Sequence, residues 1–188
     1  MKKNTLLIGG ARSGKGRFAL ELARGLGGQV LFVATAEAGD SDMAERIENH
    51  RRERPENWRT LEVTCHVGNS ILKDIGTANI VVLDCITLLV GNIFGQNEEQ
   101  TLERIEESVL EKQVMAEISE LMSCLSKITA NSIIVTNDVG LGLVPINRVG
   151  RLYRDFLGKA NQMLAQNADE VYLMIAGLPV KIKSLDKP

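Results

Sequence analysis

The chain has 188 residues, 44% of them hydrophobic and 24% charged, with a formal net charge of −2 and a pI near 5.8. This length suits one globular domain over residues 1–188 and is short for two. The balanced, slightly acidic charge excludes a surface built for nucleic acid or anionic membranes, so we expect small-molecule partners.

The first predicted element is a buried strand at residues 5–8, followed by a glycine-rich turn at 9–14 and a helix at 15–26. The turn matches the Walker pattern G-x-x-x-x-G-K-[ST], except that Gly16 replaces the hydroxyl residue that would ligate Mg²⁺. Backbone N–H groups in such a turn bind phosphate together with the positive end of the helix, and Lys15 reaches the outer phosphates. A turn that merely connects a strand to a helix needs no lysine there, so the motif predicts nucleotide binding.

Strands and helices alternate along the rest of the chain. This alternation predicts an α/β P-loop nucleotide-binding fold, a mainly parallel sheet covered by helices, with binding residues at the carboxyl ends of the strands. The expected strands are 30–34, 80–83, 132–136, 171–175 and an edge strand at 180–182; the expected helices are 42–52, 98–127 and 147–167, with a flexible loop at 139–145.

The helix at 42–52 ends near a histidine that lies among arginines. Four arginines stand within four residues of His50. Nearby positive charge favours a neutral, nucleophilic imidazole, and the arginines can hold nucleotide phosphates. The alternative is a solvated helix end, where cations suit the negative end of the dipole, and spacing alone favours that alternative. His66 has no such neighbours and is interpreted as a surface or packing residue.

Asp84 follows the apolar strand at 80–83, where the acidic residue of a Walker-loop protein meets Mg²⁺. It could instead cap the next helix, but its combination with a Walker loop favours a metal or nucleotide role. Residues 136–139 end another strand and could order the following loop or touch substrate.

The cysteines predict a reducing compartment. Cys65, Cys85 and Cys124 are widely spaced and include no C-x-x-C pair, which favours free thiols in or near the core over disulfides or a zinc site. No early apolar stretch resembles a signal peptide, and no apolar run could span a bilayer. We expect a cytoplasmic protein.

Taken together, these motifs resemble those of the bifunctional adenosylcobinamide kinase and adenosylcobinamide-phosphate guanylyltransferase family of cobalamin biosynthesis. The likeness covers nearly the whole chain and includes residues 9–15, 42–47, 50, 54–55, 58–60, 83–87, 135–140, 144–145, 147–148, 154–155, 161–162 and 168–171. The resemblance implies phosphorylation of adenosylcobinamide by ATP or GTP, and then transfer of GMP from GTP to adenosylcobinamide phosphate. It also implies Mg²⁺ as the auxiliary ion, nucleotide and corrinoid substrates, and a homo-oligomer, specifically a trimer.

The resemblance assigns catalysis to Lys15 and to His50, which would attack the α-phosphate of GTP and become a guanylyl-histidine. Glu62 would accept a hydrogen bond from a guanine edge or a ribose hydroxyl, and Asp84 would also ligate Mg²⁺. The implied nucleotide-binding residues are Gly9, Gly10, Ala11, Arg12, Ser13, Gly14, Lys15, Gly16, Ala34, Thr35, Ala36, Arg51, Arg52, Glu53, Arg54, Glu62 and Asp84.

Gly16 is the main departure from the family, whose loop has a serine there; Asn49, Asp84 and Asp138 are smaller ones. We expect guanylyl transfer to survive because it depends on His50, and kinase activity to be weaker because Mg²⁺ is less well placed. Two alternatives are a simple P-loop small-molecule kinase, with His50 as a spectator, and a non-catalytic nucleotide-binding module.

Overall fold

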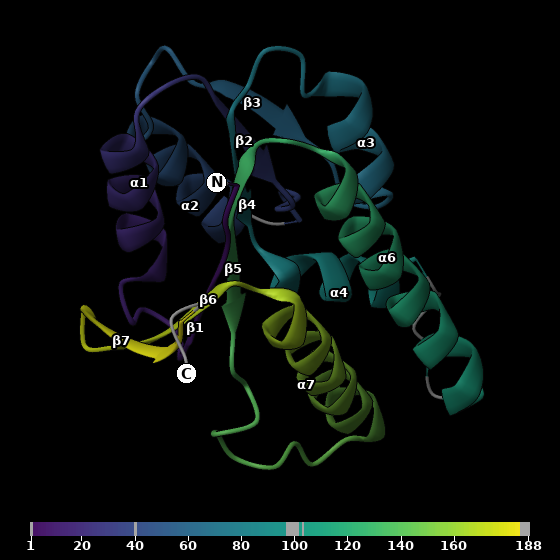
Figure 1. The fold of residues 1–188 in the computed structure, drawn as a ribbon. Coiled ribbons are helices and arrows are strands. Elements are labelled where there is room, and N and C mark those ends of the chain that lie inside the picture. The colour runs from purple at the N-terminus through teal and green to yellow at the C-terminus, as the bar shows by residue number, and fades with distance from the viewer. Residues whose placement is uncertain (1, 40, 97–101, 103, 185–188) are drawn as a thin grey trace.

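The structure is a computed structural model that describes residues 2–39, 41–96, 102 and 104–184. Within them a seven-stranded sheet has the strand order β3-β2-β4-β5-β1-β6-β7 (Figure 1). Neighbouring strands run parallel except β6 and β7, which are antiparallel. The strands are β1 Asn4–Gly9, β2 Val30–Ala34, β3 Arg59–Glu62, β4 Ile80–Asp84, β5 Asn131–Asn137, β6 Glu170–Ile175 and β7 Leu178–Lys183. The helices are α1 Lys15–Leu26, α2 Ser41–Arg52, α3 Val67–Asp74, α4 Ile86–Gly95, α6 Glu107–Lys127 and α7 Arg148–Asn167.

Helices cover both faces of the sheet, as the apolar central strands require. Figure 1 shows α1 and α2 on one face and α3, α4, α6 and α7 on the other. Every residue of β2 is buried, and so are the first four of β4. Side chains on the two faces of the strands therefore enter two separate apolar clusters, one with α1 and one with the four helices opposite. The P-loop α/β fold predicted from the sequence is confirmed.

Some predictions of individual elements were wrong. The sequence reading did not foresee α3, and it gave no bounds for the strand before His66 or for the helix after Asp84, which are β3 and α4. The strand β3 is an exposed edge strand without an apolar run, and α4 is apolar on most sides, so neither shows a clear periodicity. The helix expected from residue 98 begins, as α6, at Glu107 after an extended Glu106. Residues 97–101 and 103 lie outside the described residues.

The carboxyl ends of the parallel strands meet at one edge of the sheet. In the strand register Ala34 pairs with Asp84, Asp84 with Val135, and Gly9 with Asn137. The turns that follow β1, β2, β4 and β5 therefore share this edge, where binding residues were expected.

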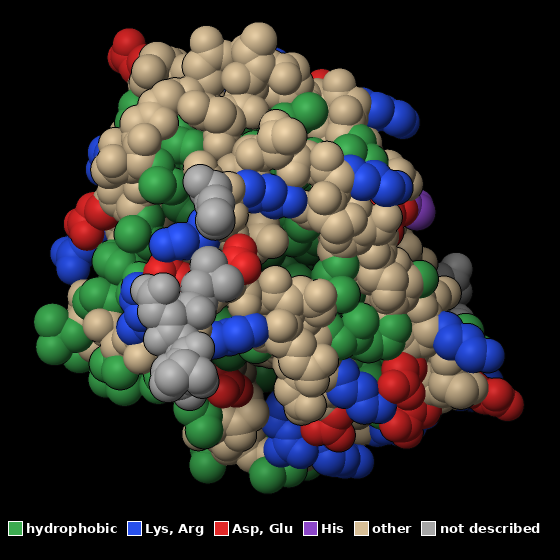
Figure 2. Space-filling model, in the orientation of Figure 1, with side chains coloured by type: hydrophobic (Ala, Val, Ile, Leu, Met, Phe, Trp, Pro, Cys, Tyr) green, Lys and Arg blue, Asp and Glu red, His purple; other side chains and the backbone are tan. Residues whose placement is uncertain are grey.

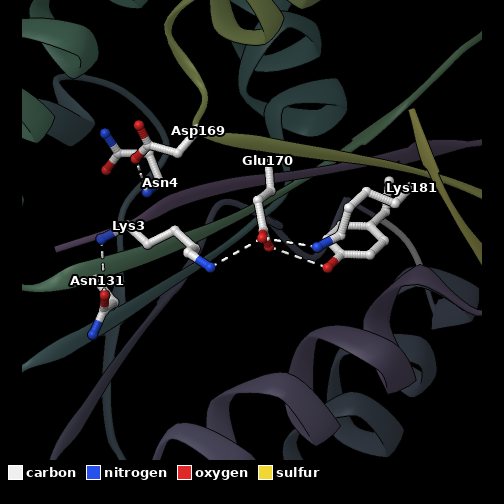
Figure 3. Close-up of polar contacts among 7 residues, drawn as sticks. Lys3, Asn4, Asn131, Asp169, Glu170 and Lys181 are labelled. Atoms are coloured by element: carbon white, nitrogen blue, oxygen red, sulfur yellow. Dashed lines mark hydrogen bonds and ion pairs between the residues drawn. The ribbon is translucent and has the colours of Figure 1, made fainter. Parts of the chain in front are cut away.

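The opposite edge is held by polar contacts around Glu170 at the start of β6. Its carboxylate accepts hydrogen bonds from Lys3 at 3.0 Å, Lys181 at 2.8 Å and the Tyr172 hydroxyl at 3.1 Å (Figure 3). Burial opposes its ionisation, but these hydrogen bonds outweigh burial and lower the pKa of Glu170 to about 2. The contacts join β6 to β7 and to the segment that leads into β1.

The three cysteines are free thiols, two of them buried, as expected for this sequence. Burial raises the pKa of Cys85 to about 11, so that thiol is protonated at neutral pH. No helix in the described parts of the chain is long and apolar enough to cross a membrane.

Candidate active site

The glycine-rich turn after β1 requires glycine at two positions for steric reasons. A Cβ atom on Gly9 would lie 2.5 Å from the carbonyl oxygen of Met174, and one on Gly14 would lie 3.0 Å from the Cα of Gly177. Gly14 also has a left-handed φ of 93°. The Gly177 N–H donates to the Ser13 carbonyl at 3.0 Å, so the β6–β7 turn supports the loop from behind.

Lys15 is buried at the start of α1 and folds back over its own loop. Its Nζ donates to the carbonyl oxygens of Gly9 at 3.0 Å and Gly10 at 2.6 Å. Burial lowers the pKa of Lys15, and the nearby Cys85 and Asp84 oppose that shift. The ammonium therefore lies inside the cradle where the phosphates of a nucleotide would bind.

His50 and Asp84 meet beside the P-loop, although they come from different elements. A Cβ atom on Gly16 would lie 3.6 Å from His50 Cε1 and 3.7 Å from Asp84 Oδ2. Burial raises the pKa of Asp84, while the nearby His50, Arg54 and Lys15 oppose that shift. His50, at the end of α2, is exposed to solvent and at the same time lies beside the P-loop and the Asp84 carboxylate.

Arg54, just after α2, completes this group. Its guanidinium carbon lies 3.8 Å above the centre of the Phe32 ring, and its Nη1 donates to Thr60 Oγ1 at 3.5 Å. The Nε of Arg54 is buried and has no hydrogen-bond partner within the described residues. Stacking on Phe32 fixes the plane of a guanidinium that still has donors to offer to a phosphate.

A second hollow, separate from the phosphate cradle of the P-loop, lies between α2 and the ends of β2 and β3. It has a volume of about 620 Å³, within the usual range for a small-molecule site. Arg51 and Glu62 form an ion pair on its wall. The other lining residues are Ala36, Glu37, Ala38, Ala44, Ile47, Glu48, Val63, Thr64 and Cys65.

Thr35 supports the site from beneath the surface. Its side chain is fully buried; the hydroxyl donates to the Cys85 carbonyl at 2.7 Å and accepts from the Cys85 N–H at 2.8 Å. Asn92 donates to the Thr35 carbonyl at 2.8 Å. The Thr35 hydroxyl thus fixes the backbone next to Asp84 and does not point toward a ligand.

The structure brings some of the predicted site residues together and separates others. The P-loop residues 9–16, His50, Arg54 and Asp84 form one group, whereas Arg51, Glu62 and Ala36 line the second hollow. Arg52 is exposed and donates to Glu48 at 3.2 Å. Glu53 takes part through its backbone, which accepts from Arg24 at 2.9 Å and donates to the Asn49 carbonyl at 3.3 Å. Arg12 is exposed at the tip of the loop.

Sequence reasoning missed Phe32, Thr60 and Asn92. Phe32 and Asn92 support site residues that lie far away in the chain, and nothing in their own neighbourhood marks them. Thr60 lies only six residues from its partner Arg54 and belongs to a family motif, but the motif gave it no role. Phe32 in particular reads as one more apolar residue of a buried strand.

Comparison with known proteins identifies clear relatives. A family model described as cobinamide kinase / cobinamide phosphate guanyltransferase matches residues 5–182. The bifunctional adenosylcobalamin biosynthesis protein CobU of Escherichia coli is 42% identical, and that of Salmonella typhimurium 41%; each match covers 95% of this chain and 98% of the relative. The corresponding protein CobP of Pseudomonas aeruginosa is 36% identical over 95% of this chain and 96% of its own.

Solved structures with the same fold are more distant in sequence. The RadB recombinase superposes with a TM-score of 0.50 at 17% identity, covering 91% of this chain and 73% of the recombinase. A protein of Pyrococcus horikoshii superposes with a TM-score of 0.55 at 8% identity, covering 98% of this chain and 88% of that protein. At these identities the likeness concerns the fold alone.

Proposed function

This chain belongs to the cobinamide kinase / cobinamide phosphate guanyltransferase family, and we propose that both reactions take place around its P-loop, His50 and Asp84. It is a bifunctional enzyme of adenosylcobalamin biosynthesis, a kinase and a guanylyltransferase. The observation that carries the assignment of residues is the approach of His50 and Asp84 to the same space beside Gly16.

In the kinase step, a hydroxyl oxygen of cobinamide attacks the γ-phosphorus of ATP or GTP. The bond from that phosphorus to the bridging oxygen breaks, the nucleoside diphosphate leaves with the electron pair, and the hydroxyl proton passes to solvent water. Lys15 exchanges its two loop carbonyls for phosphate oxygens, and the amides of the loop hold the others. Catalysis here is mainly positioning and charge stabilisation.

In the transfer step, an unprotonated ring nitrogen of His50 attacks the α-phosphorus of GTP, and pyrophosphate leaves. The product is a guanylyl-histidine with a new N–P bond. A phosphate oxygen of cobinamide phosphate then attacks the same phosphorus; the N–P bond breaks, and cobinamide-GDP and free His50 result. Asp84 compensates the positive charge that grows on the ring, and Arg54 holds the α-phosphate.

The hollow of about 620 Å³ beside α2 suits the guanosine part of the nucleotide. Glu62 and Arg51 on its wall supply an acceptor and a donor for the base or the ribose. The nucleoside and its phosphates would then lie on the two sides of the helix end that carries His50.

Asp84 fits this site as a ligand of Mg²⁺. Magnesium in phosphoryl-transfer sites is usually bound by one or two carboxylates together with substrate phosphates and water. No three His, Cys, Asp or Glu side chains among the described residues gather closely enough to hold a metal alone. When bound, the ion would neutralise phosphate charge.

Gly16→Ser tests whether the missing hydroxyl weakens the kinase. The new Cβ would lie 3.6–4.0 Å from His50 and Asp84, which is ordinary contact, so we expect a folded variant. Kinase rate or apparent Mg²⁺ affinity should rise by about three- to tenfold, because the hydroxyl adds a metal ligand. A variant with neither gain, at unchanged thermal stability, would contradict the hypothesis.

The proposed intermediate is tested with Mg²⁺ and GTP labelled at the α-phosphate, followed by denaturation. The native chain and His66→Ala, the matched histidine control, should retain acid-labile, alkali-stable label. His50→Ala should retain none, yet should still phosphorylate cobinamide. Equal labelling of the native chain and His50→Ala would remove His50 from the mechanism, and GTP binding without any label would leave a kinase or a binding module.

We also propose that residues 1–188 form one cytoplasmic domain that assembles into a homotrimer. Leu178, Val180 and Ile182 alternate along the edge strand β7 and are exposed, which supports a surface buried by a second copy. Light scattering should give three times the chain mass of 20.6 kDa. A fully active monomer would contradict this assembly.

A further inference from the structure

Residues 138–147, here called the β5–α7 loop, expose several large apolar side chains. Leu141, Leu143, Val144 and Ile146 are 80%, 96%, 64% and 99% exposed. Figure 2 shows hydrophobic side chains at the lower end of the molecule, where Figure 1 places this loop. Single exposed apolar residues are ordinary, but four within six residues form a patch of the kind that binds another molecule.

The backbone of this loop is held by specific hydrogen bonds. Asp138 Oδ1 accepts from the Gly140 N–H at 3.0 Å, and the Gly142 N–H donates to the Val139 carbonyl at 3.3 Å. Arg151 Nη1 donates to the Pro145 carbonyl at 3.2 Å. These hydrogen bonds, including the one from Arg151 of α7, hold parts of the loop backbone while its large apolar side chains stay exposed.

The loop also begins at the reaction site. The Asp138 N–H donates to the Gly9 carbonyl at 3.2 Å, and Gly9 is the residue that opens the P-loop. Gly9 is also one of the two carbonyl partners of Lys15. The apolar patch and the phosphate cradle are thus neighbouring parts of one edge of the sheet (Figure 1).

We propose that the β5–α7 loop is the surface on which the corrin ring of cobinamide rests during both reactions, an inference that rests on the proposed function. The substrate has two chemically different parts. Its alcohol or phosphate arm must reach the nucleotide, while the bulky macrocycle, whose rim carries methyl groups as well as amide side chains, lies outside the phosphate cradle. Residues 139–146 carry no charge, and they offer apolar contact to the methyl groups of such a rim on a loop that begins, at Asp138, against Gly9 of the cradle.

Position and polarity favour the corrin ring over a second copy of the chain as the occupant. A docked macrocycle needs a surface continuous with the phosphate site, and this loop provides it through Asp138 and Gly9. The exposed row on β7 offers a separate apolar surface for a second copy.

The test is the double variant Leu143→Ser/Ile146→Ser in the full chain. We expect its KM for cobinamide and for cobinamide phosphate to rise about tenfold or more, since two apolar contacts are lost. Guanylylation of His50 by GTP alone, which needs no corrinoid, should stay within about twofold of the native rate. The matched control is Leu26→Ser, an exposed leucine at the end of α1 on the far edge, which should leave both KM values unchanged.

Two results would overturn the proposal. Unchanged KM values for both corrinoids would show that the ring does not rest on this loop, and a smaller molar mass of the double variant would show that a second copy occupies the patch. Failure of the native chain to form the guanylyl-histidine would instead count against the proposed function, because that reaction does not involve the loop.

Discussion

At the residue scale, the Thr35 hydroxyl holds both polar backbone groups of Cys85, the residue after Asp84. Thr35→Val keeps the shape but leaves the buried Cys85 N–H unpaired, whereas the Cys85 carbonyl still accepts from the Leu89 N–H at 3.1 Å. We therefore expect a loss of about 1–3 kcal/mol in the free energy of unfolding. Displacement of Asp84 should also slow guanylylation of His50 by about tenfold. Urea denaturation and the labelling assay measure the two effects.

Thr35→Ser is the control because it keeps the hydroxyl. It should recover most of the guanylylation rate while losing one buried methyl group. If Val and Ser at this position slow guanylylation equally, packing of the methyl group and not the hydroxyl bond positions Asp84.

The P-loop could be predicted from the sequence because its glycines and Lys15 lie within a few adjacent residues. The meeting of His50 with Asp84 could not, since the contact depends on how α2 lies over the sheet. Spacing alone favoured a solvated helix end for His50, and only the family resemblance pointed to the site. The stacking of Arg54 on Phe32 has no local signal at all.

At the scale of elements, a carboxylate from α6 caps the N-terminus of α3. Glu117 is buried, and its two oxygens accept from the N–H groups of His66 at 2.9 Å and Val67 at 2.8 Å. A negative charge also suits the positive end of a helix. Glu117→Ala should lower the free energy of unfolding by about 2–3 kcal/mol, because it strands two donors.

Glu117→Gln should cost less, since one side-chain oxygen still accepts. Glu111→Ala, on the same helix but in a surface ion pair with Lys159, is the matched control and should change stability by less than about 1 kcal/mol. Thermal unfolding of the three variants measures their loss of stability. Equal losses of stability for Glu117→Ala and Glu111→Ala would refute the capping role.

The elements that could be predicted are those whose side chains repeat with a clear period or form buried apolar runs. The bounds of α3 and α4 could not be predicted, because α3 is short and α4 is apolar on most of its surface. The residue that caps α3 also lies in a distant helix. His66 looked isolated in the sequence, yet it lies 3.4 Å from Glu120 of that same helix.

At the scale of the whole molecule, the contacts of Glu170 make stability depend on pH. Its pKa is about 2 in the folded protein, below its ordinary value of 4.5. The stabilisation is therefore present at neutral pH and is lost as the pH falls from about 4.5 toward 2. Glu170→Gln should cost about 1 kcal/mol at pH 7, a modest value because Lys3 and Lys181 are partly exposed.

Urea denaturation of the native chain and Glu170→Gln at pH 7 and at pH 3 measures this dependence. The difference between the two proteins should shrink at the lower pH. A difference that stays constant would mean that packing, and not the charge of Glu170, holds β6 and β7 to this edge.

The overall architecture could be predicted because alternation of strands and helices constrains a parallel sheet strongly. The same alternation predicted that the site lies at the carboxyl edge of the sheet, where the turns after β1 and β4 meet. The strand order and the side of the sheet on which α2 lies are set by packing between distant segments, so the sequence pattern left them open.

The inward fold of Lys15 has a consequence for the competition among anions in a cell. A ligand must detach the ammonium from the carbonyl oxygens of Gly9 and Gly10 before it can occupy the cradle. A triphosphate replaces those contacts and fills the remaining amides of the loop as well, whereas a single orthophosphate recovers only part of what it disrupts. The contacts of Lys15 with these carbonyls thus compete with weakly bound anions, and free phosphate should inhibit the enzyme only slightly.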